Sequence, residues 1–131
     1  MKIKYVTSIF LSILTFANPS FANNWIPISA NCSGACTYID KTRIKKDKGI
    51  VQVVALTDYA SISSAQMFGL SEINELSINC IKKEFQNNQI IWYEKNMGVG
   101  KVTKKETVTN KKWFELQRYS SEEKLANFIC N

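Results

Sequence analysis

Near its end the chain reads SSEEKLANFIC over residues 120–130, and this stretch has the marks of an amphipathic helix. Ser120, followed three positions later by Glu123, is typical of a capping box, in which each side chain binds a backbone N–H at the start of a helix. Apolar residues then recur at helical spacing, and they are Leu125, Phe128 and Ile129. A helix of about three turns with one apolar stripe must bury that stripe against another layer of structure.

That layer is predicted to be a β-sheet, because the chain upstream is a series of short β-prone runs separated by polar turns. Residues 50–56 are almost continuously apolar and β-branched, which is typical of a strand covered on both faces. The other expected strands cover residues 37–40, 76–85, 89–94, 102–109 and 113–116. We therefore predict an α+β domain, in which one C-terminal helix packs on an antiparallel sheet.

Composition also predicts three connecting or edge segments. Asn87-Asn88 lies between two strand-like runs and is typical of a hairpin turn. Residues 60–72 are rich in serine and are expected to form a long connection that has room for a helical turn. Residues 102–109 alternate valine and threonine with lysine and glutamate, which favours an exposed edge strand.

An even number of cysteines in a small exported chain indicates two disulfides, and the four here are Cys32, Cys36, Cys80 and Cys130. We predict the pair Cys32–Cys36, because Gly34 permits a tight loop between them. We predict Cys80–Cys130 as the second pair, which would tie the end of the helix to the sheet. A zinc or redox site is the alternative, but the C-x3-C spacing and the absence of histidine argue against it.

The first 22 residues have the three parts of a secretory signal peptide. Lys2 and Lys4 form a basic start, residues 5–17 are apolar, and a small-residue cleavage site ends at Ala22. The apolar part is shorter than the roughly 20 residues that a membrane span needs, so an uncleaved anchor is the weaker alternative. We expect residues 23–131 to form one domain in the periplasm, in the medium or at the cell surface. No cysteine lies at the cleavage point, so no lipid is expected there.

The composition favours binding over catalysis. The formal net charge is +6, or +4 without Lys2 and Lys4 of the predicted signal peptide. Such a charge favours solubility and a loose preference for anionic partners, while export argues against nucleic acid. The chain has no histidine, which excludes Ser-His and Cys-His nucleophiles. Gly98-x-Gly100 is too short a motif for a phosphate-binding loop, and Glu122-Glu123 is explained by the start of a helix. We therefore predict a protein that is not an enzyme, with no catalytic residue, cofactor or metal site.

The candidate ligand-binding residues are five cations within eight positions of a basic stretch, and they are Lys41, Arg43, Lys45, Lys46 and Lys48. In an extended segment Arg43 and Lys45 would share one side, and Lys46 and Lys48 the other. We expect such a cluster to contact an acidic partner through several weak, salt-screened interactions. The alternative is that the stretch is only a solvated turn.

The order of these features resembles a known family. The features are Trp25, then Tyr38-Ile39-Asp40, then Leu56-Thr57-Asp58-Tyr59, then Asn79-Cys80, then Met97-Gly98-x-Gly100, then Trp113 and finally Cys130. This order is similar to the surface-adhesin protein E-like domain of Gram-negative bacteria, over nearly all of residues 23–131. The resemblance implies an antiparallel sheet with a disulfide-tied C-terminal helix, and binding of host plasma and matrix proteins. The chain differs from that family by its extra Cys32–Cys36 loop and by the absence of a lipidation cysteine.

Two functional hypotheses follow. The first is an adhesin-like module that binds host extracellular-matrix or plasma glycoproteins, or an acidic polysaccharide. The second is a periplasmic inhibitor, for example of lysozyme, or an accessory protein of the envelope. Neither hypothesis involves nucleic acid or a membrane span, and the sequence leaves the oligomeric state open, a homodimer included.

Overall fold

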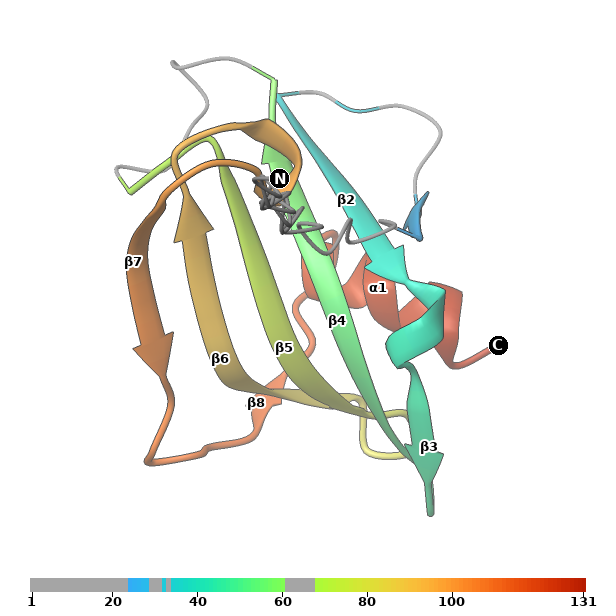
Figure 1. Cartoon of the computed structure of the whole chain (residues 1–131). Coiled ribbons are helices and arrows are strands. Elements are labelled where there is room, and N and C mark those ends of the chain that lie inside the picture. Colours follow the sequence, from blue (N-terminus) through green and yellow to red (C-terminus); the bar gives the residue numbers. More distant parts are fainter. Residues whose placement is uncertain (1–23, 29–31, 33, 61–67) are drawn as a thin grey trace, which may run out of the picture.

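The computed structural model describes residues 24–28, 32, 34–60 and 68–131 (Figure 1). Its elements in chain order are β1 (Trp25–Pro27), β2 (Ala35–Asp40), the 3-10 helix η1 (Lys41–Arg43), β3 (Lys45–Asp47), β4 (Ile50–Tyr59), β5 (Ser71–Asn79), β6 (Glu84–Tyr93), the 3-10 helix η2 (Asn96–Gly98), β7 (Val102–Thr107), β8 (Phe114–Glu115) and α1 (Ser121–Ile129). The signal peptide predicted for residues 1–22 lies outside the described residues, as does most of the predicted connection over residues 60–72. Within the described ranges, no helix is long and apolar enough to cross a membrane.

In the described part of the chain, eight strands form one antiparallel sheet with the order β1-β2-β4-β5-β6-β7. The two remaining strands lie off this path. Strand β3 pairs with the start of β4, next to the part of β4 that pairs with β2, and β8 pairs with the start of β6, next to the part of β6 that pairs with β7. Helix α1 crosses one side of the sheet behind β4 and β2, as Figure 1 shows. We call that side the helix face and the other the opposite face.

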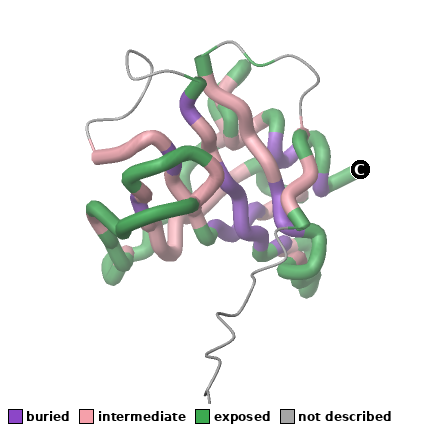
Figure 2. Tube along the Cα trace, turned by 45° about the horizontal axis from the view of Figure 1, so that its top comes forward, coloured by how far each residue is buried: buried purple, intermediate pink, exposed green. Residues whose placement is uncertain are grey.

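The hydrophobic core lies between the helix face and α1. The sheet contributes Ile39, Val51, Val53, Ala55, Leu76 and Ile78, and the helix contributes Leu125, Ala126 and Ile129. These positions alternate along their strands, because successive side chains of a strand point to opposite faces. In Figure 2 the buried trace accordingly runs through the middle of the fold, and the exposed trace lies at its edges.

Strand β4 is also buried on the opposite face, which explains why its sequence is apolar without alternation. Val54 and Leu56 are buried on that side. Element η2 folds over it, with Gly98 next to the side chains of Ile73 and Leu56. The backbone of η2 is held against β4 by a hydrogen bond of 2.7 Å from the Met97 N–H to Asp58 Oδ1.

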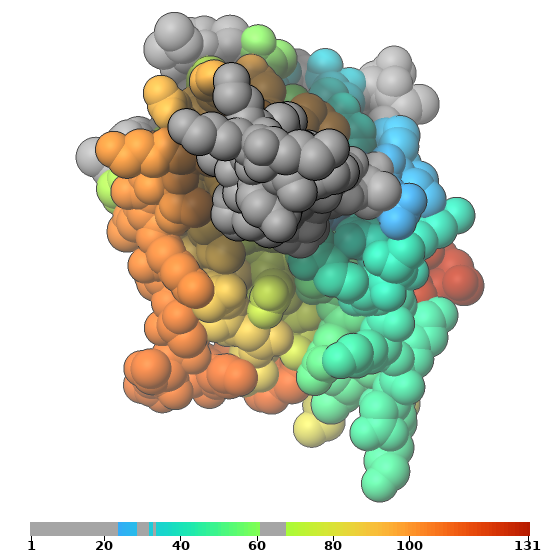
Figure 3. Space-filling view, in the orientation of Figure 1, coloured from blue at the N-terminus to red at the C-terminus, as the bar shows by residue number. Residues whose placement is uncertain are grey.

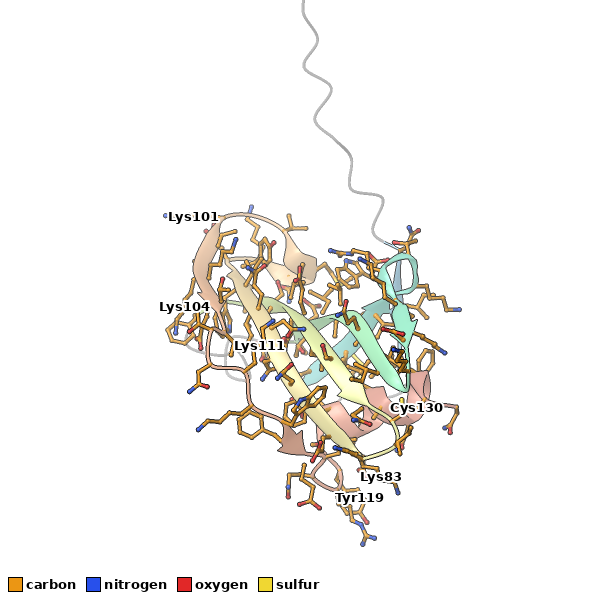
Figure 4. The ribbon with its side chains drawn as sticks, turned by 90° about the horizontal axis from the view of Figure 1, so that it is seen from below. Lys83, Lys101, Lys104, Lys111, Tyr119 and Cys130 are labelled. Carbon is orange, nitrogen blue, oxygen red and sulfur yellow. A yellow bond between two sulfur atoms is a disulfide. The ribbon has the colours of Figure 1, made fainter. Side chains whose placement is uncertain are left out.

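Helix α1 begins as the sequence predicts. The N–H of Glu123 donates to Ser120 Oγ at 3.0 Å, and Glu123 Oε2 accepts the N–H of Tyr119 at 2.5 Å. Cys130 ends the helix in a disulfide with Cys80, with Cα atoms 5.7 Å apart, so the predicted tie between helix and sheet is confirmed (Figure 4). Cys32 is bonded to Cys36, and both bonds together use all four cysteines.

The predicted hairpin at Asn87-Asn88 is wrong. The chain turns at residues 80–83 instead, and both asparagines lie within β6. The register of β5 and β6 shifts there, since Glu75 pairs with Gln89 and Leu76 with Asn87, which leaves Asn88 as the extra residue of a β-bulge.

Several element boundaries and the burial of one helix residue also differ from the predictions. Strand β5 begins at Ser71, so the connection before it is shorter than expected. Strand β8 covers Phe114–Glu115 alone, without Trp113. Phe128 was expected in the buried stripe of the helix, but 42% of it is exposed.

Candidate partner-binding groove

The basic stretch, residues 41–48, folds into the 3-10 helix η1, the short strand β3 and the hairpin turn that leads to β4. Asp40 organises its first part, because its Oδ1 accepts the Thr42 N–H at 2.9 Å and its Oδ2 lies 2.7 Å from Arg43 Nε. Burial raises the pKa of Asp40, but the hydrogen bonds from Thr42 and Arg43 and the charge of Arg43 outweigh it, so the pKa is lowered. The Arg43 guanidinium also lies 5.7 Å from the centre of the Trp25 ring. Arg43 is therefore engaged in holding the fold.

The two neighbouring lysines of β3 lie on different sides of the sheet. Lys45 pairs with Gln52 and Lys46 with Val51, and alternation along the strand sends their side chains to opposite faces. Lys45 and Arg43 line a hollow of about 210 Å³ on the opposite face, with Gln52 and Glu75 among its other lining residues. The acid in this hollow offsets part of its positive charge.

Lys46 lies instead on the helix face, in a groove of about 230 Å³ between the basic stretch and the end of α1. We call it the helix-edge groove, and its lining residues are Ile39, Lys41, Ile44, Lys46, Phe128, Ile129 and Asn131. Its floor is apolar, two ammonium groups border it, and none of these lining residues is acidic. Such a surface suits an anionic partner that also carries an apolar side chain.

Lys48 lies apart from both hollows, in the turn between β3 and β4. Its φ of +48° and that of +81° at Gly49 bring the chain into a two-residue hairpin turn. The expectation that Lys46 and Lys48 share one side of an extended segment is therefore wrong. The hairpin projects from the lower end of the molecule in the space-filling view (Figure 3).

The structure thus divides the predicted set of cations into three. Lys41 and Lys46 meet in the helix-edge groove, Arg43 and Lys45 lie together on the opposite face, and Lys48 is at the hairpin turn. Sequence reasoning missed Phe128, which its helical spacing placed in the core. It also missed Ile44, which lies between the lysines without a pattern of its own.

A small polar cavity of about 40 Å³ lies between the sheet and the start of α1, with Glu72, Asn74 and Glu122 among its lining residues. Burial raises the pKa of Glu72, and the charge of Glu122 adds to this, while the polar groups of Trp92 and Tyr59 beside the carboxyl oppose the shift. Among the residues that the structure describes, no three His, Cys, Asp or Glu side chains gather in a way that would hold a metal ion.

A mostly antiparallel sheet, with one short C-terminal helix tied to it by a disulfide, defines a small α+β fold. The sequence profile of the family Surface-adhesin protein E matches residues 25–131, and the chain belongs to this family. No curated protein matches the chain.

Solved structures of Haemophilus influenzae protein E share the fold. Its crystal form II is 19% identical, with a TM-score of 0.57 over 82% of this chain and 87% of that one. The structure of protein E from non-typeable Haemophilus influenzae is 17% identical, with a TM-score of 0.54 over 86% of this chain and 79% of that one. At this identity the likeness concerns the fold alone.

Proposed function

We propose that this protein is exported by a leader at residues 1–22 and acts without catalysis as an adhesin-like binding protein. In this proposal the helix-edge groove takes acidic, partly apolar segments of host matrix or plasma glycoproteins. Membership of the surface-adhesin family supports the class of function. The observation that carries the choice of site is that Lys41 and Lys46 border an apolar floor that includes Phe128.

The chemistry of the groove favours a polypeptide over an acidic polysaccharide. Exposed ion pairs are worth at most about 1 kcal/mol each, so two lysines alone would give weak, salt-sensitive contact. An apolar side chain inserted against Phe128 makes more hydrophobic contact than a sulfated sugar ring, which is mostly covered by hydroxyl and sulfate groups. A buried anchor within a polar rim is how protein interfaces gain most of their affinity. A partner segment with one apolar residue between acids would use both features.

The test uses fluorescein-labelled peptides of glutamates with a central leucine, and the same peptides with a central serine, measured by fluorescence anisotropy. Wild-type protein should bind the leucine peptide more tightly, and binding should weaken with added salt. Lys46→Glu should lower that affinity by about tenfold, since it turns an attraction into a repulsion. Phe128→Ser should remove the preference for leucine over serine.

Lys45→Glu is the matched control, because it makes the same charge change one residue away on the other face of the sheet. It should change the affinity by less than about twofold. Equal losses in Lys45→Glu and Lys46→Glu would show that only net charge matters and would contradict the groove as the site. Protease treatment of intact cells tests display at the surface, where an adhesin must be cut before the outer membrane is opened.

A further inference from the structure

The end of the molecule formed by the β5–β6 turn and the segment before α1 carries a concentration of exposed apolar side chains. Of the large apolar residues exposed in the described ranges, four belong to these two short segments, and they are Ile81, Trp113, Phe114 and Tyr119. Ile81 is 80% exposed and Tyr119 is 81% exposed. We call residues 81–83 and 111–119 together the end surface.

Direct contacts hold the two segments side by side. The Leu116 N–H donates to the Lys83 carbonyl oxygen at 3.0 Å, and the rings of Phe85 and Phe114 lie 5.7 Å apart. In Figure 4, Lys83 and Tyr119 lie at the same edge of the molecule, away from Lys101 and Lys104. The β5–β6 turn and the segment around Phe114 and Leu116 therefore lie side by side although they are distant in sequence.

The exposed apolar side chains sit on ordered turns. Asn79 Oδ1 accepts the N–H groups of Ile81 and Lys82, at 3.2 and 3.0 Å, which fixes the turn that presents Ile81. Tyr119 has a φ of +65°, a conformation that bulky residues rarely adopt, and its N–H is bound by Glu123. Both side chains are thus displayed by a fixed backbone, which has little conformational entropy left to lose on binding.

The same surface is strongly basic. Its cations outnumber its acids by five to one, with Glu115 as the acid and Lys82, Lys83, Lys111, Lys112 and Arg118 as the cations. All six side chains are exposed. Aromatic and aliphatic groups that protrude among several cations are complementary to a surface that is anionic outside and apolar just beneath.

We propose that the end surface docks this protein on anionic phospholipid bilayers. Tyrosine and tryptophan prefer the level of the lipid headgroups, and lysine and arginine bind the headgroup phosphates. Ile81 favours a membrane over a sugar polymer. An aliphatic side chain at the tip of a turn cannot stack on a sugar ring, but it can enter the boundary between the lipid headgroups and the acyl chains. This contact uses none of the residues of the helix-edge groove, so it is independent of the proposed function.

Sedimentation with large vesicles tests the proposal, with protein recovered after export from expressing cells. Wild-type protein should sediment with equimolar phosphatidylcholine and phosphatidylglycerol but not with phosphatidylcholine alone. Lys82→Glu/Lys83→Glu should reduce partition by at least about 30-fold, since each cation near such a membrane is worth about 1 kcal/mol. Ile81→Ser/Tyr119→Ser should reduce it by about tenfold through lost apolar contact.

Val99→Ser/Lys101→Glu is the matched control, because it removes one exposed apolar group and reverses one lysine elsewhere on the surface. It should sediment like wild type. A second measurement follows tryptophan emission, which should shift to the blue on anionic vesicles. That shift should vanish in Trp113→Phe, because Trp92 is already buried and Trp25 lies in β1 against Arg43, outside the end surface.

Equal sedimentation with both vesicle types, equal losses in the control and the end-surface variants, or no loss in the lysine variant would each overturn the proposal. Retention on heparin that the lysine variant loses, without vesicle binding by wild type, would assign the end surface to an acidic polymer and would also overturn it. The thermal midpoint by circular dichroism identifies any variant that fails to fold. If one of the two end-surface variants fails to fold, vesicle sedimentation of the other tests the proposal.

Discussion

The disulfide between Cys80 and Cys130 should make the larger contribution of the two to stability. It closes a loop with a sequence separation of 50, whereas the separation of Cys32 and Cys36 is 4. In the chain-entropy estimate, the long loop is worth about 4 kcal/mol and the short one about 2 kcal/mol. We therefore expect Cys80→Ser/Cys130→Ser to lose about 2 kcal/mol more free energy of unfolding than Cys32→Ser/Cys36→Ser.

The position of the bond in the fold supports this order. Helix α1 has nine residues, fewer than the roughly 12–15 that an isolated helix needs, and it depends on packing to form. Leu125, Ala126 and Ile129 provide that packing from one face of the helix. Without the bond at Cys130, the end of the helix is held by these contacts alone and can detach before the sheet unfolds.

Urea unfolding, followed by far-ultraviolet circular dichroism, measures both variants against wild type. The m-value should rise in the Cys80/Cys130 variant, because an unfolded chain without the long loop exposes more surface. Paired serine substitutions leave no free thiol to form new bonds. Equal losses in the two variants, or a larger loss in the Cys32/Cys36 variant, would refute the reasoning from loop length.

Three further predictions concern single residues. Ser120→Ala should lower the free energy of unfolding by about 1 kcal/mol in urea titrations, since it removes the acceptor for the Glu123 N–H, and Ser120→Asp should restore most of it. Glu72→Gln should raise the thermal midpoint at neutral pH, because the raised pKa of Glu72 means that its ionised form costs stability there. That gain should shrink as the pH falls towards the ordinary value of 4.5, because Glu72 takes up its proton at a higher pH in the folded protein than in the unfolded chain. A gain independent of pH would contradict the assignment. Gly69→Ala should destabilise the protein by at least about 2 kcal/mol in the same titrations, because the added methyl group would collide with the Tyr93 carbonyl oxygen. Gly100→Ala would be strained by its φ of +87°, but its methyl would meet only the flexible side chain of Lys95, so it should cost less.

Much of the fold was predictable because its signals are local. The capping residues of α1 lie three positions apart, and the composition of residues 50–56 alone predicts a strand that is buried on both faces. The turn at residues 80–83 was hidden because apolar Ile81 continues the pattern of the strand before it. The hairpin predicted at Asn87-Asn88 was wrong because residues that favour turns also occur where a β-bulge leaves one residue unpaired.

The groove could not be predicted, because it is built by residues far apart in sequence. The expectation of an extended segment already placed Lys45 and Lys46 on different sides, but no local pattern indicated that the end of α1 would lie beside Lys46. Arg43 resembles its neighbours in sequence, and only Asp40 and the distant Trp25 show that it stabilises the fold. Phe128 differs from the buried Leu125 by one helical turn, and how far the sheet extends beneath the helix decides which of them is covered.

The shape of the helix-edge groove also depends on the Cys80–Cys130 disulfide. Phe128, Ile129 and Asn131 line the groove and flank Cys130, whose disulfide fixes the end of the helix to the sheet. A helix end that detaches would carry half of the groove away from Lys41 and Lys46, so affinity and oxidation state are linked through one short segment. The binding proposed for this groove would therefore need the Cys80–Cys130 disulfide, as stability does, and such bonds persist in oxidising compartments.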